Sequence, residues 1–209
     1  MATGLIPLFP LQLVVFPRVR LPLHIFEDRY KEMVGNAIRD SSPFGIVLAR
    51  EDGIAGAGCT VLVDRVLEMY PDGRMDILAS GQRRFEILSL SEEKDYLQGE
   101  VQFFDDEDLE PPPAGVREQA LKNYRALSEL GTVRGHSEPD LEDRQVSFQV
   151  AQAVPDLEFL NRILLERSES ARLHEFNQYL AAYLPRQQTI ERMKELAPTN
   201  GHGPKPAGL

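Results

Sequence analysis

The histidines and the single cysteine are the side chains of this 209-residue chain best suited to metal binding or nucleophilic catalysis. A zinc site typically takes several such ligands at short spacings. The four histidines are widely separated, and none belongs to a His-x-x-x-His or Glu-x-x-His pattern: His24, His136, His174 and His202. Cys59 has no sequence neighbour that would stabilise a thiolate. We therefore predict no metal site, and we expect Cys59 to be a buried, small apolar residue.

The glycines and lysines do not form a phosphate-binding loop. Such a loop requires Gly-x-x-x-x-Gly-Lys followed by Ser or Thr, so that backbone amides and the lysine contact phosphate. None of the five lysines precedes Ser or Thr, and Gly53, Gly56 and Gly58 are in the wrong order for a dinucleotide site. We expect these three glycines to form a connecting loop, and we predict no cofactor.

Carboxylates are abundant, but acid–base catalysis requires two at a defined separation, and the sequence singles out no pair. Glu27 and Arg83 are candidates for an ion pair across a sheet, with a structural role. Because no catalytic pattern remains, we predict that the protein is not an enzyme.

The charge of the chain argues against a nucleic-acid partner. The formal net charge is −10, whereas nucleic-acid binding depends on Lys and Arg side chains that neutralise phosphates. Residues 1–17 are uncharged, but prolines interrupt them and no basic region precedes the apolar stretch. Neither a signal peptide nor a membrane span fits this pattern. We expect a cytoplasmic protein without a membrane partner.

The first hundred residues mostly show the alternation of apolar and polar side chains that is typical of strands. These strands would position any functional site in this part of the chain. Pro7, Pro10 and Pro17 remove backbone donors, so we predict short, broken strands at the start. Residues 44–48, 61–69, 75–79 and 96–103 have strand-like patterns. One helix is expected after Pro22, with one apolar face: Phe26, Tyr30, Met33, Val34, Ala37 and Ile38.

An acidic and proline-rich segment, residues 105–113, separates this part from a second one. Its self-repelling acids predict a solvated linker that does not join a packed core. We therefore expect a β subdomain at residues 1–104, a helical subdomain at 114–197 and a disordered tail at 198–209.

The helical subdomain is predicted from apolar residues at helical spacing. A first helix covers residues 116–130 and can end at Gly131. Residues 143–154 alternate like a strand, although their context favours a helix. Asp156 and Ser168 are predicted N-caps. The helix after Ser168 is expected to end before Pro185, with a further turn or two within residues 189–196.

Several motifs resemble the N-terminal substrate-binding domain of the Lon protease family. They are Pro-Leu-Phe-Pro-Leu at residues 7–11, Val-Phe-Pro at 15–17, Pro-Leu-x-Ile-Phe-Glu-x-Arg-Tyr at 22–30 and Gly-x-x-Arg-Phe-x-Ile at 81–87. Residues 147–151, 164–166 and 172–173 resemble helices of the same family. Arg18 departs from the pattern, since many members have glycine there.

The resemblance implies an α+β fold: a PUA-like β pseudo-barrel with one inserted helix, followed by a C-terminal helical bundle. It also implies that the motif residues are mainly architectural: Pro7, Phe9, Pro10, Pro17, Pro22, Phe26, Glu27, Arg29, Tyr30, Gly81, Arg83 and Phe85. It does not imply proteolysis, because the ATPase module and the serine–lysine protease domain of a complete Lon are not expected in these 209 residues. We expect a standalone, bacterial-type member.

By this resemblance, the protein is expected to recognise unfolded, damaged or apolar polypeptide segments in protein quality control. Candidate contacts are Phe16, Arg18, Val19 and Leu21, together with the cleft between barrel and bundle. One alternative is an adaptor for a single protein partner, which would dock through the acidic residues 105–110. Another is a PUA-like module that binds a small ligand or RNA.

Overall fold

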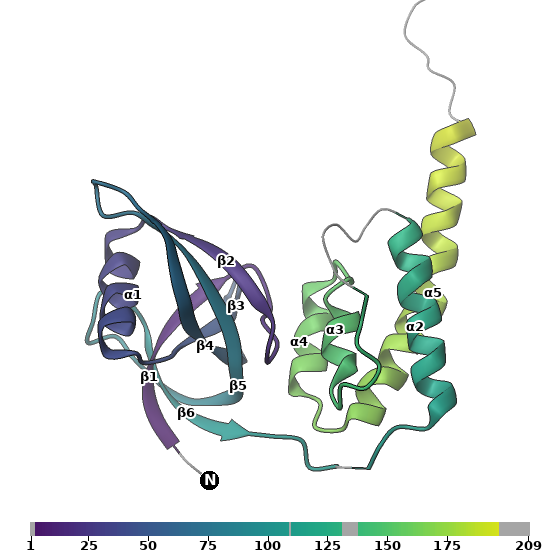
Figure 1. The fold of residues 1–209 in the computed structure, drawn as a ribbon, viewed down its shortest axis with the longest axis horizontal. Helices are drawn as coiled ribbons and strands as arrows, with labels where there is room; N and C mark the ends of the chain where they lie inside the picture. The colour runs from purple at the N-terminus through teal and green to yellow at the C-terminus, as the bar shows by residue number, and fades with distance from the viewer. Residues whose placement is uncertain (1–2, 109, 131–137, 197–209) are drawn as a thin grey trace, which may run out of the picture.

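The computed structural model describes residues 3–108, 110–130 and 138–196, and it contains a mixed sheet and a group of helices (Figure 1). The strands are β1 (Thr3–Leu11), β2 (Arg20–Ile25), β3 (Phe44–Arg50), β4 (Gly53–Met69), β5 (Met75–Ser91) and β6 (Gln98–Phe104). Helix α1 (Asp28–Asp40) lies between β2 and β3, and four helices follow the strands: α2 (Ala114–Glu129), α3 (Val146–Ala151), α4 (Leu157–Leu165) and α5 (Glu169–Leu196). The predicted α+β class is confirmed. The predicted helix end at Gly131 and the predicted disordered tail lie outside the described residues.

Five of the strands close into a ring. The sheet order is β2-β5-β4-β3-β1-β6, and β6 also pairs with β5. Strand β5 is long enough to pair with β2 through residues 75–80 and with β6 through residues 84–91, while β4 lies on its other side. This closure produces the predicted pseudo-barrel, with β2 attached as an additional strand.

Strand β1 is continuous despite two prolines, so the prediction of short, broken strands is wrong here. Residues 3–7 pair with β6, whereas residues 8–11 pair with β3. The Leu8 amide donates to the Leu97 carbonyl at 2.8 Å, on the β6 side. Backbone amides alternate in direction along a strand. The Pro7 nitrogen therefore faces the β3 side, where pairing with β3 has not yet begun. The Pro10 nitrogen faces the β6 side, where pairing with β6 has already ended. Each proline therefore lies where its missing donor breaks no ladder.

The glycine cluster lies in strand β4 rather than in the predicted connecting loop. The ring of Phe85 on β5 passes over Gly58 on β4 and reaches Gly45 on β3. A Cβ atom at Gly58 would lie 2.7 Å from Phe85 Cζ and 2.3 Å from the Ile46 carbonyl oxygen, and one at Gly45 would lie 2.6 Å from Phe85 Cζ. Close packing therefore requires glycine at positions 45 and 58. The spacing of glycines in the sequence does not reveal this requirement.

Helix α1 buries the apolar face that the sequence predicts, with one exception. Tyr30, Met33, Val34 and Ala37 are buried. Phe26 precedes the helix because strand β2 continues to Ile25, and its side chain is 60% exposed. The prediction that Phe26 belongs to the buried face is therefore wrong.

The helical part agrees with several predictions and corrects one. Residues 146–151 form helix α3, and the Asp156 side chain caps α4 by accepting from the Phe159 amide at 2.9 Å. Ser168 Oγ accepts from the Ala171 amide at 3.3 Å, as an N-cap does. Helix α5 continues through Pro185 to Leu196 instead of ending before it. A proline removes one backbone donor, but the flanking turns of a long helix keep theirs.

The sheet and the helices share the larger of two apolar clusters, and the smaller one lies among the strands. The Phe16 ring stacks on Phe148 of α3, with ring centroids 5.0 Å apart, and the same cluster extends to α5. Helix α4 packs against β4. Cys59 is buried in this core, as predicted, and burial raises the pKa of its thiol to about 12, which disfavours the reactive thiolate.

Candidate functional site

The predicted turn, residues 16–21, lies at the junction between sheet and helices. Phe16 is fully buried there, so it is unable to offer an exposed apolar anchor. Arg18 has a φ of 64°, in the left-handed region that favours glycine, and its guanidinium lies 2.7 Å from Asp143 Oδ1. The geometry at Arg18 explains why a glycine is expected there. Gly81 approaches the same turn closely, since a Cβ atom there would lie 2.1 Å from the Phe16 carbonyl oxygen.

Two of the other turn candidates, Arg18 and Val19, line a cleft between barrel and helices. Its volume is about 350 Å³, and Arg18 and Val19 face Gln145, Gln149 and Gln152 across it. Leu21 is partly buried against the core and does not line this cleft. Phe148 also lines the cleft.

The acidic segment after β6 is mostly exposed, as the predicted solvated linker would be, but the Asp106 side chain enters the packed junction between sheet and helices. The Asp106 side chain is only 9% exposed, and its carboxylate lies 2.5 Å from the Arg84 guanidinium and 2.6 Å from that of Arg172. Arg167 pairs with Glu107. The two partners of Asp106 lie on β5 and α5, far from it in the sequence. The expected repulsion among neighbouring acids therefore did not indicate these ion pairs. Charges that are already paired within the chain offer little to a docking partner.

The predicted ion pair between Glu27 and Arg83 does not form. Glu27 pairs with Arg29 at 2.8 Å, and Arg83 pairs with Asp105 at 2.9 Å. Within the Gly-x-x-Arg-Phe motif, the arginine that precedes Phe85 is Arg84, which is buried. Sequence reasoning selected its exposed neighbour instead. The position beside Phe85 in the motif was the signal that could have identified Arg84.

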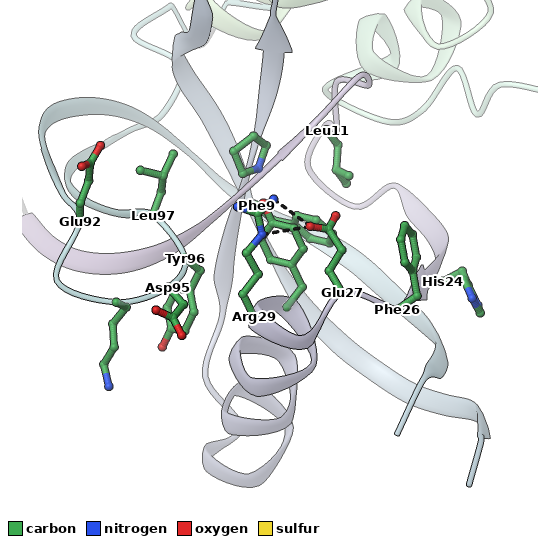
Figure 2. A pocket seen from close by; sticks show the side chains of 13 residues that line it. Phe9, Leu11, His24, Phe26, Glu27, Arg29, Glu92, Asp95, Tyr96 and Leu97 are labelled. Carbon is green, nitrogen blue, oxygen red and sulfur yellow. Dashed lines mark hydrogen bonds and ion pairs between the residues drawn. The ribbon is translucent and has the colours of Figure 1, made fainter. Parts of the chain in front are cut away.

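A groove of about 640 Å³ opens beside the end of β1, between the start of α1 and the connection from β5 to β6 (Figure 2). Its apolar lining consists of Phe9, Pro10, Leu11, Phe26, Tyr30, Tyr96 and Leu97. Its polar lining consists of His24, Glu27, Arg29, Glu92, Lys94 and Asp95. In Figure 2 the Glu27–Arg29 pair lies between Phe26 and His24 at one end and Glu92 and Asp95 at the other. The sequence analysis assigned a mainly architectural role to the motif residues of this groove.

Aromatic rings form the floor of the groove. The rings of Phe9 and Tyr30 are 4.1 Å apart between centroids, and the Arg29 guanidinium lies 4.6 Å above the Tyr30 ring. Burial raises the pKa of the Tyr30 hydroxyl, and Arg29 opposes this shift. Phe9, Tyr30 and Tyr96 are buried, whereas Phe26 extends into solvent at the edge. The groove therefore joins a packed aromatic floor to one exposed aromatic side chain.

Strand β1 presents its open edge to the groove. No described strand pairs with residues 9–11 on the side opposite β3, because the pairing with β6 covers residues 3–7. The Pro10 carbonyl faces this side by the alternation along the strand. An extended polypeptide in the groove would meet both backbone and aromatic side chains.

Metal chemistry and membrane insertion receive no support from the described part of the chain. Within it, no three His, Cys, Asp or Glu side chains are grouped so as to hold a metal ion. None of its helices has both the length and the apolar character needed to cross a bilayer.

Comparison with known proteins assigns the family. Residues 5–194 match the model of the ATP-dependent protease La (LON) substrate-binding domain. The chain belongs to this family. The match is to a binding domain, rather than to an ATPase or protease domain.

Relatives of this Lon substrate-binding domain are much longer proteins. The Lon protease of Parabacteroides distasonis is 33% identical over 110 residues, which cover 48% of this chain and 13% of that protein. The Lon protease of Roseiflexus castenholzii is 28% identical over 134 residues, or 60% of this chain and 17% of that protein. The chain thus spans less than a fifth of either relative.

Solved structures share the fold. A Lon N-terminal domain protein from Xanthomonas campestris has a TM-score of 0.68 and 24% identity, over 85% of this chain and 98% of that one. The N-terminal domain of Lon protease from Mycobacterium avium complex has a TM-score of 0.61 and 13% identity over the same shares. The architecture of this Lon substrate-binding domain is therefore that of Lon N-terminal domains.

Proposed function

We propose that this Lon substrate-binding domain is a non-enzymatic module that recognises extended, apolar polypeptide segments in the groove beside β1. The observation that carries the proposal is Phe26, a large aromatic side chain that is 60% exposed at the edge of a concave, aromatic-lined surface. Exposed apolar surface rimmed by polar groups is typical of binding sites. The Pro10 carbonyl at the open edge of β1 adds a backbone hydrogen-bond acceptor that does not depend on the client's sequence.

The same geometry favours unfolded clients. A folded protein buries its apolar side chains and pairs its backbone, so it presents neither group in extended form. An unfolded or damaged chain presents both. We propose that the domain acts in the cytoplasm in protein quality control, and that it supplies recognition while other proteins or domains supply any catalysis.

The adaptor alternative is less well supported. It relied on the acidic segment 105–110 as a docking element, but the Asp106 side chain is only 9% exposed and Asp105, Glu107 and Asp108 interact with residues of the same chain. An RNA ligand would meet a chain of net charge −10.

The test replaces Phe26 with serine. Loss of an aromatic contact worth about 1.5–3 kcal/mol should weaken binding of a labelled, unfolded apolar peptide by about tenfold or more, measured by fluorescence anisotropy. Leu88→Ser is the matched control, because Leu88 is 52% exposed on β5 and lies outside the groove lining. Circular dichroism would verify that both variants are folded. Equal peptide affinity for the wild type and Phe26→Ser would refute the proposal.

A further inference from the structure

A second cavity adjoins the groove and is lined by residues of β2, β4 and β5. Its volume is about 410 Å³, and its apolar lining is Pro22, Leu23, Leu67 and Ile77. His24 lines both cavities, so the two share one wall. Leu67 is 50% exposed and provides a second large apolar side chain beside this wall. The exposed apolar surface therefore continues beyond Phe26.

The shared wall is held in place by its neighbours. Strand register sets His24 of β2 opposite Asp76 of β5, and Asp76 opposite Glu68 of β4. His24 Nδ1 lies 2.6 Å from Asp76 Oδ1, and the Tyr70 hydroxyl donates to Asp76 Oδ2 at 2.8 Å. The His24 ring also stacks on Phe26, with 5.9 Å between centroids. A histidine fixed by a carboxylate and a ring keeps its orientation, and its other nitrogen remains available to a ligand.

The charges around both cavities indicate the occupant. Five carboxylates line them: Glu27, Glu68, Asp76, Glu92 and Asp95. Only Arg29 and Lys94 oppose these among the Lys and Arg side chains of the two described linings. Such a surface favours a ligand with basic residues and repels an acidic one. Glu27 and Asp76 are already paired, with Arg29 and His24, so the preference rests on the excess of acidic over basic side chains in the two linings. A second copy of this chain, with its net charge of −10, would also be repelled.

We propose that the substrate site continues from the groove across His24 into the cavity at Leu67, and that it takes extended segments with two apolar anchors and basic, rather than acidic, residues between them. One anchor contacts Phe26 and the other contacts Leu67. The inference rests on the proposed function of the groove and extends it to the length and charge of the client segment.

The experiment compares three labelled peptides by fluorescence anisotropy. The first has two apolar anchors separated by lysines, the second has the same anchors separated by glutamates, and the third has one anchor. The proteins are the wild type, Leu67→Ser, Phe26→Ser and the control Leu88→Ser, each verified as folded by circular dichroism. We expect Leu67→Ser to weaken the two-anchor lysine peptide by about fivefold or more, towards the one-anchor value, without changing the one-anchor peptide.

The outcomes separate the inference from the function on which it rests. If Leu67→Ser binds the two-anchor lysine peptide as the wild type does, while Phe26→Ser weakens all peptides, the second subsite is wrong and the groove stands. If Phe26→Ser changes nothing, the proposed function itself fails. Equal binding of the lysine and glutamate peptides at low salt would overturn the charge preference. Dimerisation of the wild type that Leu67→Ser abolishes, measured by sedimentation, would assign Leu67 to self-association instead.

Discussion

Asp106 connects three parts of the molecule through the two oxygens of its carboxylate. It pairs with Arg84 of β5 and with Arg172 of α5, and it accepts from the Gln145 side chain at 2.9 Å. Arg172 is fully buried and also pairs with Glu169 at 2.8 Å. Buried charges are tolerated when they are paired and hydrogen-bonded, and removing one partner leaves another charge uncompensated.

Asp106→Asn should therefore lower the free energy of unfolding by about 3 kcal/mol or more, because it leaves Arg84 and Arg172 without their shared carboxylate. Urea denaturation at neutral pH would measure the loss. Asp105→Asn is the matched control: its side chain is 76% exposed, and its pair with Arg83 should contribute about 1 kcal/mol or less. Similar losses for the two variants would contradict this account.

The cost of Asp106→Asn should also depend on pH. Hydrogen bonds and charge from Arg172, with Gln145 and Arg84, outweigh burial and lower the pKa of Asp106. A carboxyl with a lowered pKa in the folded state contributes stability above its unfolded pKa of about 3.9, and this is lost as pH falls through the folded pKa. The stability difference between wild type and variant should therefore shrink below about pH 4. Urea titrations at neutral and acid pH would test this, and a constant difference would argue against it.

At the scale of elements, the strands are shaped by where neighbouring strands begin and end. Pro7 and Pro10 suggested a broken β1, because a proline in the middle of a sheet removes a ladder bond. Strand β1 changes its partner from β6 to β3, so the nitrogen of each proline faces the side on which that residue has no partner strand. Local propensity described the prolines correctly, but it carried no information about which edge each one faces.

Gly58→Ala should lower the free energy of unfolding by about 1–3 kcal/mol, because the added methyl group meets the Ile46 carbonyl and the Phe85 ring. Gly56→Ala provides a control within the same strand, since its Cβ would meet no atom within 4 Å. Thermal unfolding would compare them. A melting temperature of Gly58→Ala equal to that of Gly56→Ala would mean that the strands move apart at low cost.

At the scale of the whole molecule, barrel and helices meet through packed aromatic and charged side chains. Phe16 and Phe148 stack at the junction, and Asp106 joins β5 to α5 nearby. The predicted subdomains 1–104 and 114–197 remain predictions, but their shared core implies that they unfold together. Cooperative unfolding is expected when one continuous core spans both parts.

Phe16 and Phe26 should consequently behave in opposite ways. Phe16→Ala should lower the free energy of unfolding by about 3–5 kcal/mol, because it opens a cavity between barrel and helices. Phe26→Ala should change stability by about 0.5 kcal/mol or less but weaken peptide binding. Paired denaturation and anisotropy measurements would separate the two. Loss of binding without loss of stability in Phe16→Ala would contradict its place in the core.

The sequence by itself determined the α+β class, the family and several local features, among them the buried face of α1 and the caps at Asp156 and Ser168. The resemblance of several motifs to the Lon N-terminal family implied the class and the family. Each local feature depends on residues a few positions apart, so periodicity and spacing record it. Only the tertiary structure decided that Phe26 is exposed while Phe16 is buried, and that Asp106 lies between Arg84 and Arg172. Those outcomes depend on ring closure, strand register and the docking of helices. They bring together residues far apart in the chain, Asp106 with Arg172 and Phe16 with Phe148, and no local pattern encodes such distances.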